Sequence, residues 1–222
     1  MFTHYKNDAI RKLVIGFGTL FNNIKIVRYR KNGTTTEHLI PLSYAPKEKF
    51  IKRLINPSSI SDRTRVEIDV PQMAFEITDI LYDPNRKMNK IFDHHGSGPE
   101  GQTLSSKMEV PYNFIFGLYV YSRNIDENLE IMEQILPTFS PEFVISLNVT
   151  DIHKKIDVPI SLNKTILTQE YEGDFSTRRM VVSTFQFTAK YYVYNRVKSS
   201  DVIREFDLSA FNEFDDTQID II

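Results

Sequence analysis

The stretch His94–Gln102, HHGSGPEGQ, comes nearest in this chain to residue types and spacing that do chemistry. Gly96, Gly98 and Gly101 match the G-x-G-x-x-G spacing that holds a dinucleotide pyrophosphate when it joins a buried strand to a helix. The preceding KIFDHH is too short and polar for a buried central strand, and the following QTLSSKMEVPY has no helical stripe. We therefore predict that the glycines let a loop between two strands bend, and we expect no cofactor.

The adjacent histidines His94 and His95, with Asp93 beside them, suggest a metal site. A zinc site needs three or four ligands with workable geometry, and adjacent side chains diverge. The remaining histidines are scattered along the chain, at His4, His38 and His153. The pattern favours two solvated histidines, protonated against a neighbouring carboxylate, and no metal.

Familiar catalytic signatures do not occur in the sequence. It has no G-x-S-x-G, no H-E-x-x-H, no Walker loop and no cysteine nucleophile, and its carboxylates form no distinctive acid/base pair. Arg178 and Arg179 open the last predicted strand and could touch phosphate, although a basic pair at an exposed strand end is the commoner case. We predict that the protein is not an enzyme.

Bulk composition limits the class of protein. A length of 222 residues suits one large domain, and 12% aromatic residues favour broad sheet faces or interfaces. The net charge of −2 argues against duplex binding, and the lack of cysteine excludes disulfides and thiolate metal sites. Without a long apolar run or an apolar N-terminal signal core, the sequence predicts a protein made and used in a reducing cytoplasm, with no membrane partner.

The elements that must position these residues begin with a helix over residues 7–23. Asn7 or Asp8 is expected to cap it, and a tight contact with a neighbouring element would explain Gly16 and Gly18 inside it, although tolerance is an equal alternative. A hairpin should follow, turning at Asn32-Gly33, and then a second helix from Pro46 to Ile55. Long strands are predicted at residues 65–83, bent or bulged at Pro71, and at 110–123, and further strands at 142–149, 164–173 and 177–195.

The clearest helix in the sequence is NIDENLEIMEQIL, residues 124–136. Asn124 and Glu127 form a plausible capping box, and Pro137 ends the helix. One apolar stripe is expected to pack on the sheet, formed by Ile125, Leu129, Met132, Ile135 and Leu136. On this interpretation, Leu129→Asp destabilises the folded subunit.

Together these patterns predict an α+β fold with a mixed, mostly antiparallel sheet and helices packed on it. Residues 1–198 form the predicted domain, interrupted by a flexible loop at about 84–107 with no clear period. Residues 199–222 form an acidic extension with seven carboxylates and several scattered apolar residues. The extension is either a mobile tail or a segment that orders on a partner with a basic surface.

The stretch YSRNIDENLEIMEQILPTFSPEF resembles the central signature of the tail terminator, or tail sheath stabiliser, of contractile-tailed phages of the T-even type. Its matching positions are Arg123, Asp126, Glu133, Gln134, Ile135, Leu136, Pro137, Phe139 and Pro141. RKLVIGFGTLFNNIKIVR, IPLSYAPKEKFIKRL and STRRMVVSTFQFTAKYYVY are similar to other parts of that family, in the same order. The resemblance covers roughly residues 1–197, and the C-terminal region is shorter than in the family pattern.

The resemblance implies a structural virion protein without catalysis or cofactor. Such a protein forms a homohexameric ring that ends the tail tube, keeps the sheath extended and connects the tail to the neck, assembled in the host cytoplasm. The implied partners are further copies of the chain, the sheath protein, the tube or a tube-capping protein, and neck or head-completion proteins, while DNA passes through without sequence-specific binding. We take the following as candidate interface residues: Lys87, Lys90, His94, His95, Arg123, Arg178, Arg179, Phe206, Phe211 and Phe214.

Three alternatives remain open at this point. Another neck or head-completion ring of the same virion would share these properties and differ only in position. A nucleotide-binding enzyme would use the glycines at 96–101, and a nucleic-acid-binding β module would use Lys87, Lys90 and strand tyrosines. Calorimetric titration with nucleotides and salt-dependent binding to single strands would separate the last two.

Overall fold

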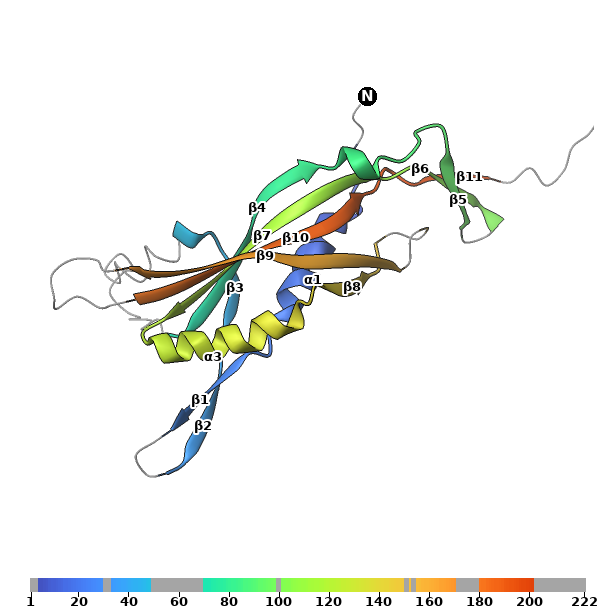
Figure 1. Ribbon diagram of the computed structural model, residues 1–222. Coiled ribbons are helices and arrows are strands. Elements are labelled where there is room, and N and C mark those ends of the chain that lie inside the picture. The colour runs from blue at the N-terminus through green and yellow to red at the C-terminus, as the bar shows by residue number, and fades with distance from the viewer. Residues whose placement is uncertain are drawn as a thin grey trace, which may run out of the picture.

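The computed structural model describes residues 4–29, 33–48, 70–98, 101–149, 152, 155–170 and 180–201. In these parts a long sheet carries two helices, α1 and α3, on one face (Figure 1). The helices and 3-10 turns are α1 Ala9–Leu20, η2 Pro84–Arg86, α3 Ile125–Ile135 and η4 Leu136–Thr138. The strands are β1 Lys25–Tyr29, β2 Thr35–Leu39, β3 Leu42–Tyr44, β4 Gln72–Tyr82, β5 Asp93–Ser97, β6 Thr103–Lys107, β7 Val110–Ser122, β8 Glu142–Leu147, β9 Ile156–Glu170, β10 Met180–Val193 and β11 Lys198–Ser200.

The main sheet has six strands in the order β3-β4-β7-β10-β9-β8. The β3–β4 pair is parallel and the other pairs are antiparallel, so the predicted α+β class with a mixed, mostly antiparallel sheet is confirmed. The main core lies between this sheet and the two helices, and a smaller cluster around Tyr119 and Tyr121 covers part of the other face. β7 and β10 lie at the centre of the sheet and line the main core with alternate residues, and the second half of β7 is buried on both faces.

Helix α1 packs on the sheet through phenylalanines. Phe17 is fully buried and stacks on Phe116 with 4.2 Å between ring centroids, and its ring also lies near those of Phe75 and Phe187. The predicted cap is wrong, because neither candidate side chain accepts from the first turn. Asn7 instead donates to the backbone oxygens of Tyr194 and Asn195 at 3.2 and 3.1 Å, which ties the start of the helix to the end of β10.

Close packing explains both glycines of α1, as the tight-contact alternative expected. A Cβ at Gly16 would lie 2.9 Å from Cδ2 of Leu147, and a Cβ at Gly18 would lie 2.9 Å from Cζ of Phe75. Leu147 can rotate its side-chain end, whereas the ring of Phe75 is 5% exposed and held between Phe17 and Tyr44. An added methyl group should therefore lower the stability of the fold more at Gly18 than at Gly16.

We expect Gly18→Ala to lower the free energy of unfolding by about 1–3 kcal/mol, because Phe75 must leave its packed position. The matched variant Gly16→Ala should stay within about 1 kcal/mol of the parent, since helix propensity improves while Leu147 gives way. Urea unfolding followed by circular dichroism measures both. Equal losses in the two variants would contradict this account of the helix contact.

The buried face of α3 differs from the predicted stripe. Asn128, Ile131 and Ile135 face the sheet and are buried, whereas Leu129 is 42% exposed. The predicted capping box is also wrong, because Asn124 makes no side-chain cap and Oε1 of Glu127 pairs with Nε of Arg28 at 3.0 Å. The helix is thus rotated relative to the sequence prediction, and only Ile135 of the predicted stripe is buried. The exposure of Leu129 contradicts the expectation that Leu129→Asp destabilises the folded subunit.

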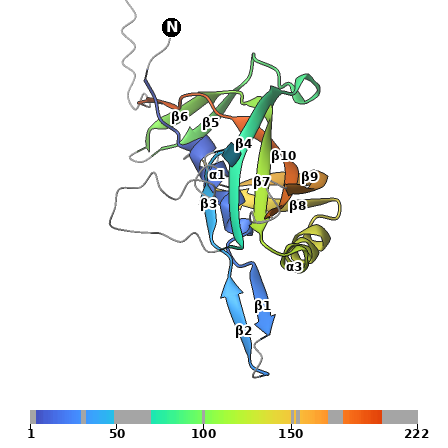
Figure 2. The same cartoon turned by 90° about the vertical axis from the view of Figure 1, so that its left-hand side faces the viewer.

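The predicted hairpin is present and projects from the body of the molecule (Figure 2). Its strands pair from Lys25↔Leu39 to Tyr29↔Thr35, and Gly33 has the expected positive φ of 75°. Side chains of α3 bind the edge of β1: Glu130 accepts from the Val27 amide at 3.0 Å, and Gln134 donates to the Lys25 carbonyl at 2.7 Å. These bonds fix the base of the hairpin against the helix.

Several other predicted elements have different bounds in the structure. The strand predicted at 65–83 is described from residue 70 onward, and β4 begins just after the cis Val70-Pro71 bond. β9 starts at Ile156, before the predicted 164, because IDVPIS pairs with β8 while the strand from Ile160 onward pairs with β10. The second predicted helix beyond Glu48, and the turn after Glu170, lie outside the described residues.

Within the described ranges, no helix has both the length and the apolar character needed to cross a bilayer.

Candidate functional site

The segment predicted as an irregular loop, residues 84–107, contains regular structure. After the turn η2, β5 and β6 pair antiparallel from Asp93↔Lys107 to Ser97↔Thr103, and β11 adds to β6 (Figure 1). We call residues 84–107 with β11 the arm. The sequence prediction missed these strands because most of their residues are polar or have short side chains, and only Leu104 and Ser106 among them are buried.

The glycines of the opening stretch lie in this hairpin. Gly96 is within β5 opposite Leu104, Gly98 donates its amide to the Gln102 carbonyl at 2.7 Å, and Gly101 has a φ of 77°. The G-x-G-x-x-G spacing therefore joins two antiparallel strands. A pyrophosphate site of this type needs the N-terminus of a helix at that place, and here a strand follows.

Arg86 anchors the base of the arm to the main sheet. Its Nε lies 2.8 Å from Oδ2 of Asp83, its Nη2 donates to Oδ1 of Asn113 at 2.8 Å, and its guanidinium lies 5.1 Å from the ring centroid of Tyr192. The Arg86 side chain holds the pKa of Asp83 below its ordinary value, so the carboxylate stays ionised and the pair persists. The arm is thus fixed at its root by charge-assisted bonds.

The two histidines of the arm lie on opposite faces of β5. Nε2 of His94 is 2.7 Å from Oε2 of Glu109, whereas His95 is exposed. Lys107 pairs with Asp93 at 3.0 Å, and Asn195 donates to the Met108 carbonyl at 2.9 Å. Among the described residues, no group of three or more histidines and carboxylates is arranged to hold a metal ion. The contact between His94 and Glu109 joins the arm to the start of β7.

The link between η2 and β5 forms a basic and apolar projection. Lys87 and Lys90 are exposed, and they line a shallow open hollow with Met88 and Asn89. Ile91 is 84% exposed and Phe92 is 62% exposed, which is unusual for side chains of this size. We call Lys87, Met88, Lys90, Ile91 and Phe92 the basic knob.

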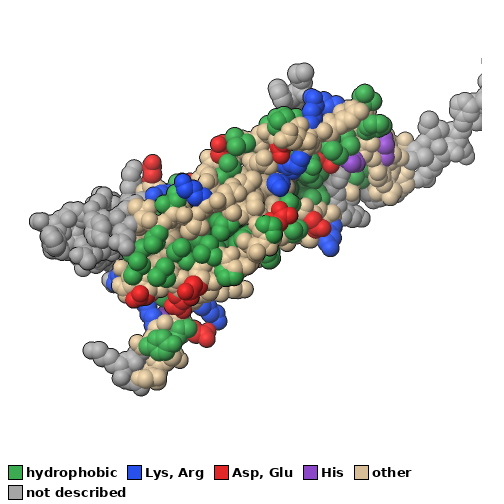
Figure 3. Space-filling model, viewed as in Figure 1, with side chains coloured by type: hydrophobic (Ala, Val, Ile, Leu, Met, Phe, Trp, Pro, Cys, Tyr) green, Lys and Arg blue, Asp and Glu red, His purple; other side chains and the backbone are tan. Residues whose placement is uncertain are grey.

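A second apolar surface lies on α3. Ile125, Leu129 and Leu136 are about two-fifths exposed at 39%, 42% and 40%, and the partly buried Met132 completes their helical spacing. The exposed Asp126 and Glu133 flank this row on the solvent side. We call these six residues the α3 outer face. Figure 3 shows hydrophobic side chains gathered over this part of the molecule, with acidic side chains along their lower border.

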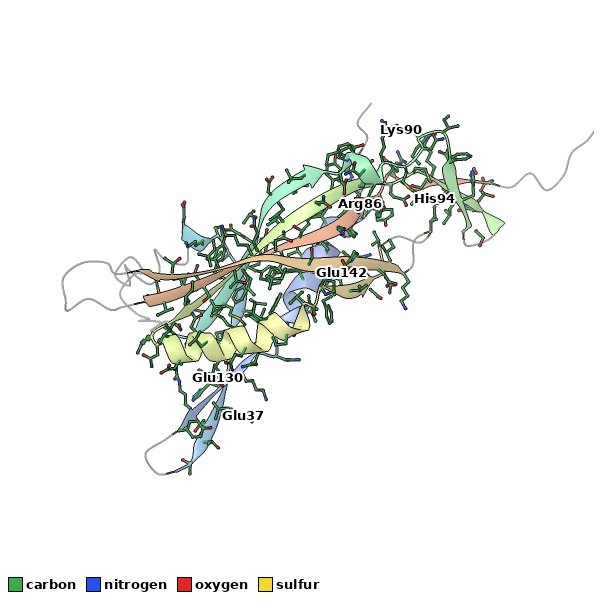
Figure 4. All side chains as sticks on the ribbon, viewed as in Figure 1. Glu37, Arg86, Lys90, His94, Glu130 and Glu142 are labelled. Carbon is green, nitrogen blue, oxygen red and sulfur yellow. The ribbon has the colours of Figure 1, made fainter. Side chains whose placement is uncertain are left out.

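The structure separates the predicted interface residues into groups. Lys87, Lys90, His94 and His95 are all on the arm, whereas Arg123 is exposed just before α3, at the far end of β7 (Figure 4 labels Lys90 and His94). The rest lie outside the described residues: Arg178, Arg179, Phe206, Phe211 and Phe214. Sequence reasoning missed Arg86, whose signal is its position three residues after Asp83, and it missed the α3 outer face.

The perturbed ionisable groups have structural causes. Burial and then the carboxylate of Glu76 raise the pKa of Tyr119 to about 12, and burial raises the pKa of Tyr191 and Tyr194 above the ordinary range. The Tyr119 hydroxyl donates to Glu76 at 3.0 Å, and Tyr191 donates to the Ala9 carbonyl at 3.2 Å. Tyr119 and Tyr191 are therefore neutral donors that hold core elements together.

Comparison with known proteins relates the chain to phage tail proteins. The family model described as the T4-like virus Myoviridae tail sheath stabiliser matches residues 4–220. The tail completion protein gp15 of Enterobacteria phage T4 is 28% identical over 207 residues, which cover 90% of this chain and 76% of that protein.

Proposed function

The chain belongs to the tail sheath stabiliser family of T4-like Myoviridae viruses, and on that basis we propose that it forms a homohexameric ring on the end of the tail. As a member of this family it is a structural tail protein of a phage virion. The ring caps the tube and the last layer of sheath, prevents further growth and keeps the sheath extended. Its other side docks the neck of the filled head, which places it at the head–tail junction.

The family match over nearly the whole chain carries this proposal. The name of the phage T4 relative, a tail completion protein, fits a part that finishes the tail before it joins another assembly. The structure adds a physical reason. Its aromatic core makes a rigid body, while its apolar exposed surfaces lie on separate parts of the molecule. A ring needs such separate contact surfaces on each subunit.

The partners follow from the position of the ring. The sheath protein and the tube or a tube-capping protein contact one side, and neck or head-completion proteins contact the other, while DNA passes through the channel without sequence readout. We also propose that residues 1–198 are the folded ring-forming domain. The acidic extension 199–222 then serves as a docking segment whose apolar residues and carboxylates meet a basic partner surface.

Tails assembled with and without this protein test the proposed function. With the protein, electron micrographs should show a ring at the end of the tail opposite the baseplate, extended sheaths, and tails that join filled heads. Without it, sheaths should shorten or dissociate and heads should stay separate. Normal joining and stable sheaths without the protein would refute the proposal, and a ring seen only on isolated heads would favour a neck protein.

A further inference from the structure

We propose that the basic knob of one copy docks on the α3 outer face of the next copy around the ring. The inference rests on the proposed ring and specifies the contact that would build it. Both surfaces are exposed in the structure.

The chemistry of the two surfaces is complementary. Residues 84–92 carry three basic side chains and no acidic one, and the knob adds three exposed apolar side chains. Helix α3 carries four carboxylates and no basic residue, beside its exposed apolar row. Docking would bury apolar side chains of both surfaces while Lys87 and Lys90 meet Asp126 and Glu133 at the border. Such opposite charges around an apolar centre favour one orientation of the contact.

The geometry excludes a contact between these surfaces within one copy. Strand β7 has 13 residues and joins the arm at Val110 to the turn before α3 at Ser122. At roughly 3.3 Å per residue the strand spans about 40 Å. Figure 4 shows Lys90 and the helix bearing Glu130 on well-separated parts of the molecule. Only a second copy can bring the knob to the helix.

A contact between two different surfaces repeats from copy to copy. Each subunit offers one knob and one α3 outer face, so an open row leaves one of each uncovered, whereas a closed ring leaves none. The Arg86 anchor and the His94–Glu109 pair hold the arm in place before docking. A pre-positioned arm loses little conformational freedom on binding.

The C-terminal extension is the rival occupant of the knob, because it is acidic and contains apolar residues. It leaves the described structure at Asp201, whose Oδ1 accepts from Gln102 at 3.3 Å on the arm. Covering the knob with this segment would leave the α3 outer face exposed. Contact between copies covers both surfaces at once, and for that reason we favour it.

Cysteine cross-linking tests the contact directly, because the chain has no cysteine of its own. Lys90→Cys and Glu133→Cys are placed on separate chains, mixed, and treated with a short thiol cross-linker, both as purified protein and bound to tails. We expect a covalent dimer from the mixture and a ladder of oligomers from the double variant. Lys90→Cys mixed with Glu142→Cys, an exposed residue of β8 outside both surfaces, is the matched control.

The outcomes separate this inference from the proposed function. If a ring forms but Lys90→Cys cross-links to Glu133→Cys no more than to the Glu142→Cys control, the proposed contact is overturned and the proposed ring is not. Stronger cross-linking of Lys90→Cys to Phe211→Cys assigns the knob to the C-terminal extension and also overturns it. Knob-to-helix cross-links in an oligomer that does not bind tails support the contact and refute the proposed function.

Charge reversal gives a second readout. Lys87→Glu with Lys90→Glu should weaken self-association about tenfold or more, measured by light scattering, because like charges then meet at the border. Self-association should be restored when this variant is mixed with chains that carry Asp126→Lys and Glu133→Lys, because opposite charges then meet again at the border. Restoration by the second pair is specific to this contact, and its absence would overturn the proposal even if each pair alone impairs assembly.

Discussion

Ile131→Asp is expected to lower the free energy of unfolding by about 4 kcal/mol or more, because it places an unpaired carboxylate in the core and removes buried apolar volume. Ile131 is fully buried in the main core cluster beneath α3. A loss of this size is a large part of the stability of a typical domain. Urea unfolding, or failure to purify a folded subunit, measures the effect.

Leu129→Asp is the matched control, with the same new side chain two positions away. Leu129 is 42% exposed on the α3 outer face, so its carboxylate stays hydrated and the stability loss should be about 1 kcal/mol or less. The same variant should impair self-association, because it places a charge in the apolar centre of the proposed contact. Equal destabilisation by both variants would mean that the buried face of α3 has been assigned incorrectly.

The sequence could predict that residues 124–136 form a helix but not which side faces the sheet. Counting apolar side chains favours the row Ile125, Leu129, Met132, Ile135 and Leu136, and of these five only Ile135 is buried against the sheet. The residues of α3 that face the sheet are instead Asn128, Ile131 and Ile135, because the Asn128 side chain forms hydrogen bonds with Ser122 on β7 and Ser183 on β10. A buried polar residue changes which side of an amphipathic helix faces the core. The sequence pattern does not reveal this, because one of its hydrogen-bond partners, Ser183, lies 55 residues away.

The arm shows a different limit. Long strands such as β7 and β10 were predictable because they are rich in aromatic and β-branched residues over many positions, with alternation in the middle of β10. β5 and β6 have mostly polar, small or histidine side chains, and they pair through backbone bonds with little burial. Such a hairpin depends on ties to the rest of the chain, here through Arg86, Glu109 and β11. None of these ties forms a periodic pattern.

The exposure of Lys87, Lys90 and His95 on the arm was predictable, because a basic, glycine-rich segment between long strands is exposed in most folds. Their separation from Arg123 follows from the length of β7, which the sequence indicated. The acidic apolar face of α3 could not be foreseen, since the same residues were interpreted as core. A surface that resembles a core stripe and remains exposed is a common feature of proteins that assemble.

Asn128→Leu is expected to lower the free energy of unfolding by about 2–4 kcal/mol, although it adds apolar volume, because the buried Ser183 hydroxyl loses its oxygen acceptor and Ser122 Oγ loses the amide that donates to it. Asn128 Nδ2 donates to Oγ of Ser122 at 3.0 Å and to the Val181 carbonyl at 3.5 Å, while Ser183 donates to Asn128 Oδ1. Ser122, Asn128 and Ser183 are all fully buried. This network joins α3 to β7 and β10 and fixes the rotation of the helix. Chemical denaturation followed by circular dichroism measures the loss.

Removing the Ser183 hydroxyl, which has lost its oxygen acceptor in Asn128→Leu, should recover part of that loss. In Asn128→Leu with Ser183→Ala, an apolar pair replaces a broken polar one, so the double variant should be more stable than Asn128→Leu alone by about 1 kcal/mol or more. Ser183→Ala by itself should destabilise, because the Asn128 carbonyl loses its donor. Additive losses in the double variant would contradict a coupled network. Since the same bonds set which side of α3 faces outward, a rotated helix in Asn128→Leu should also weaken cross-linking between the knob and the α3 outer face.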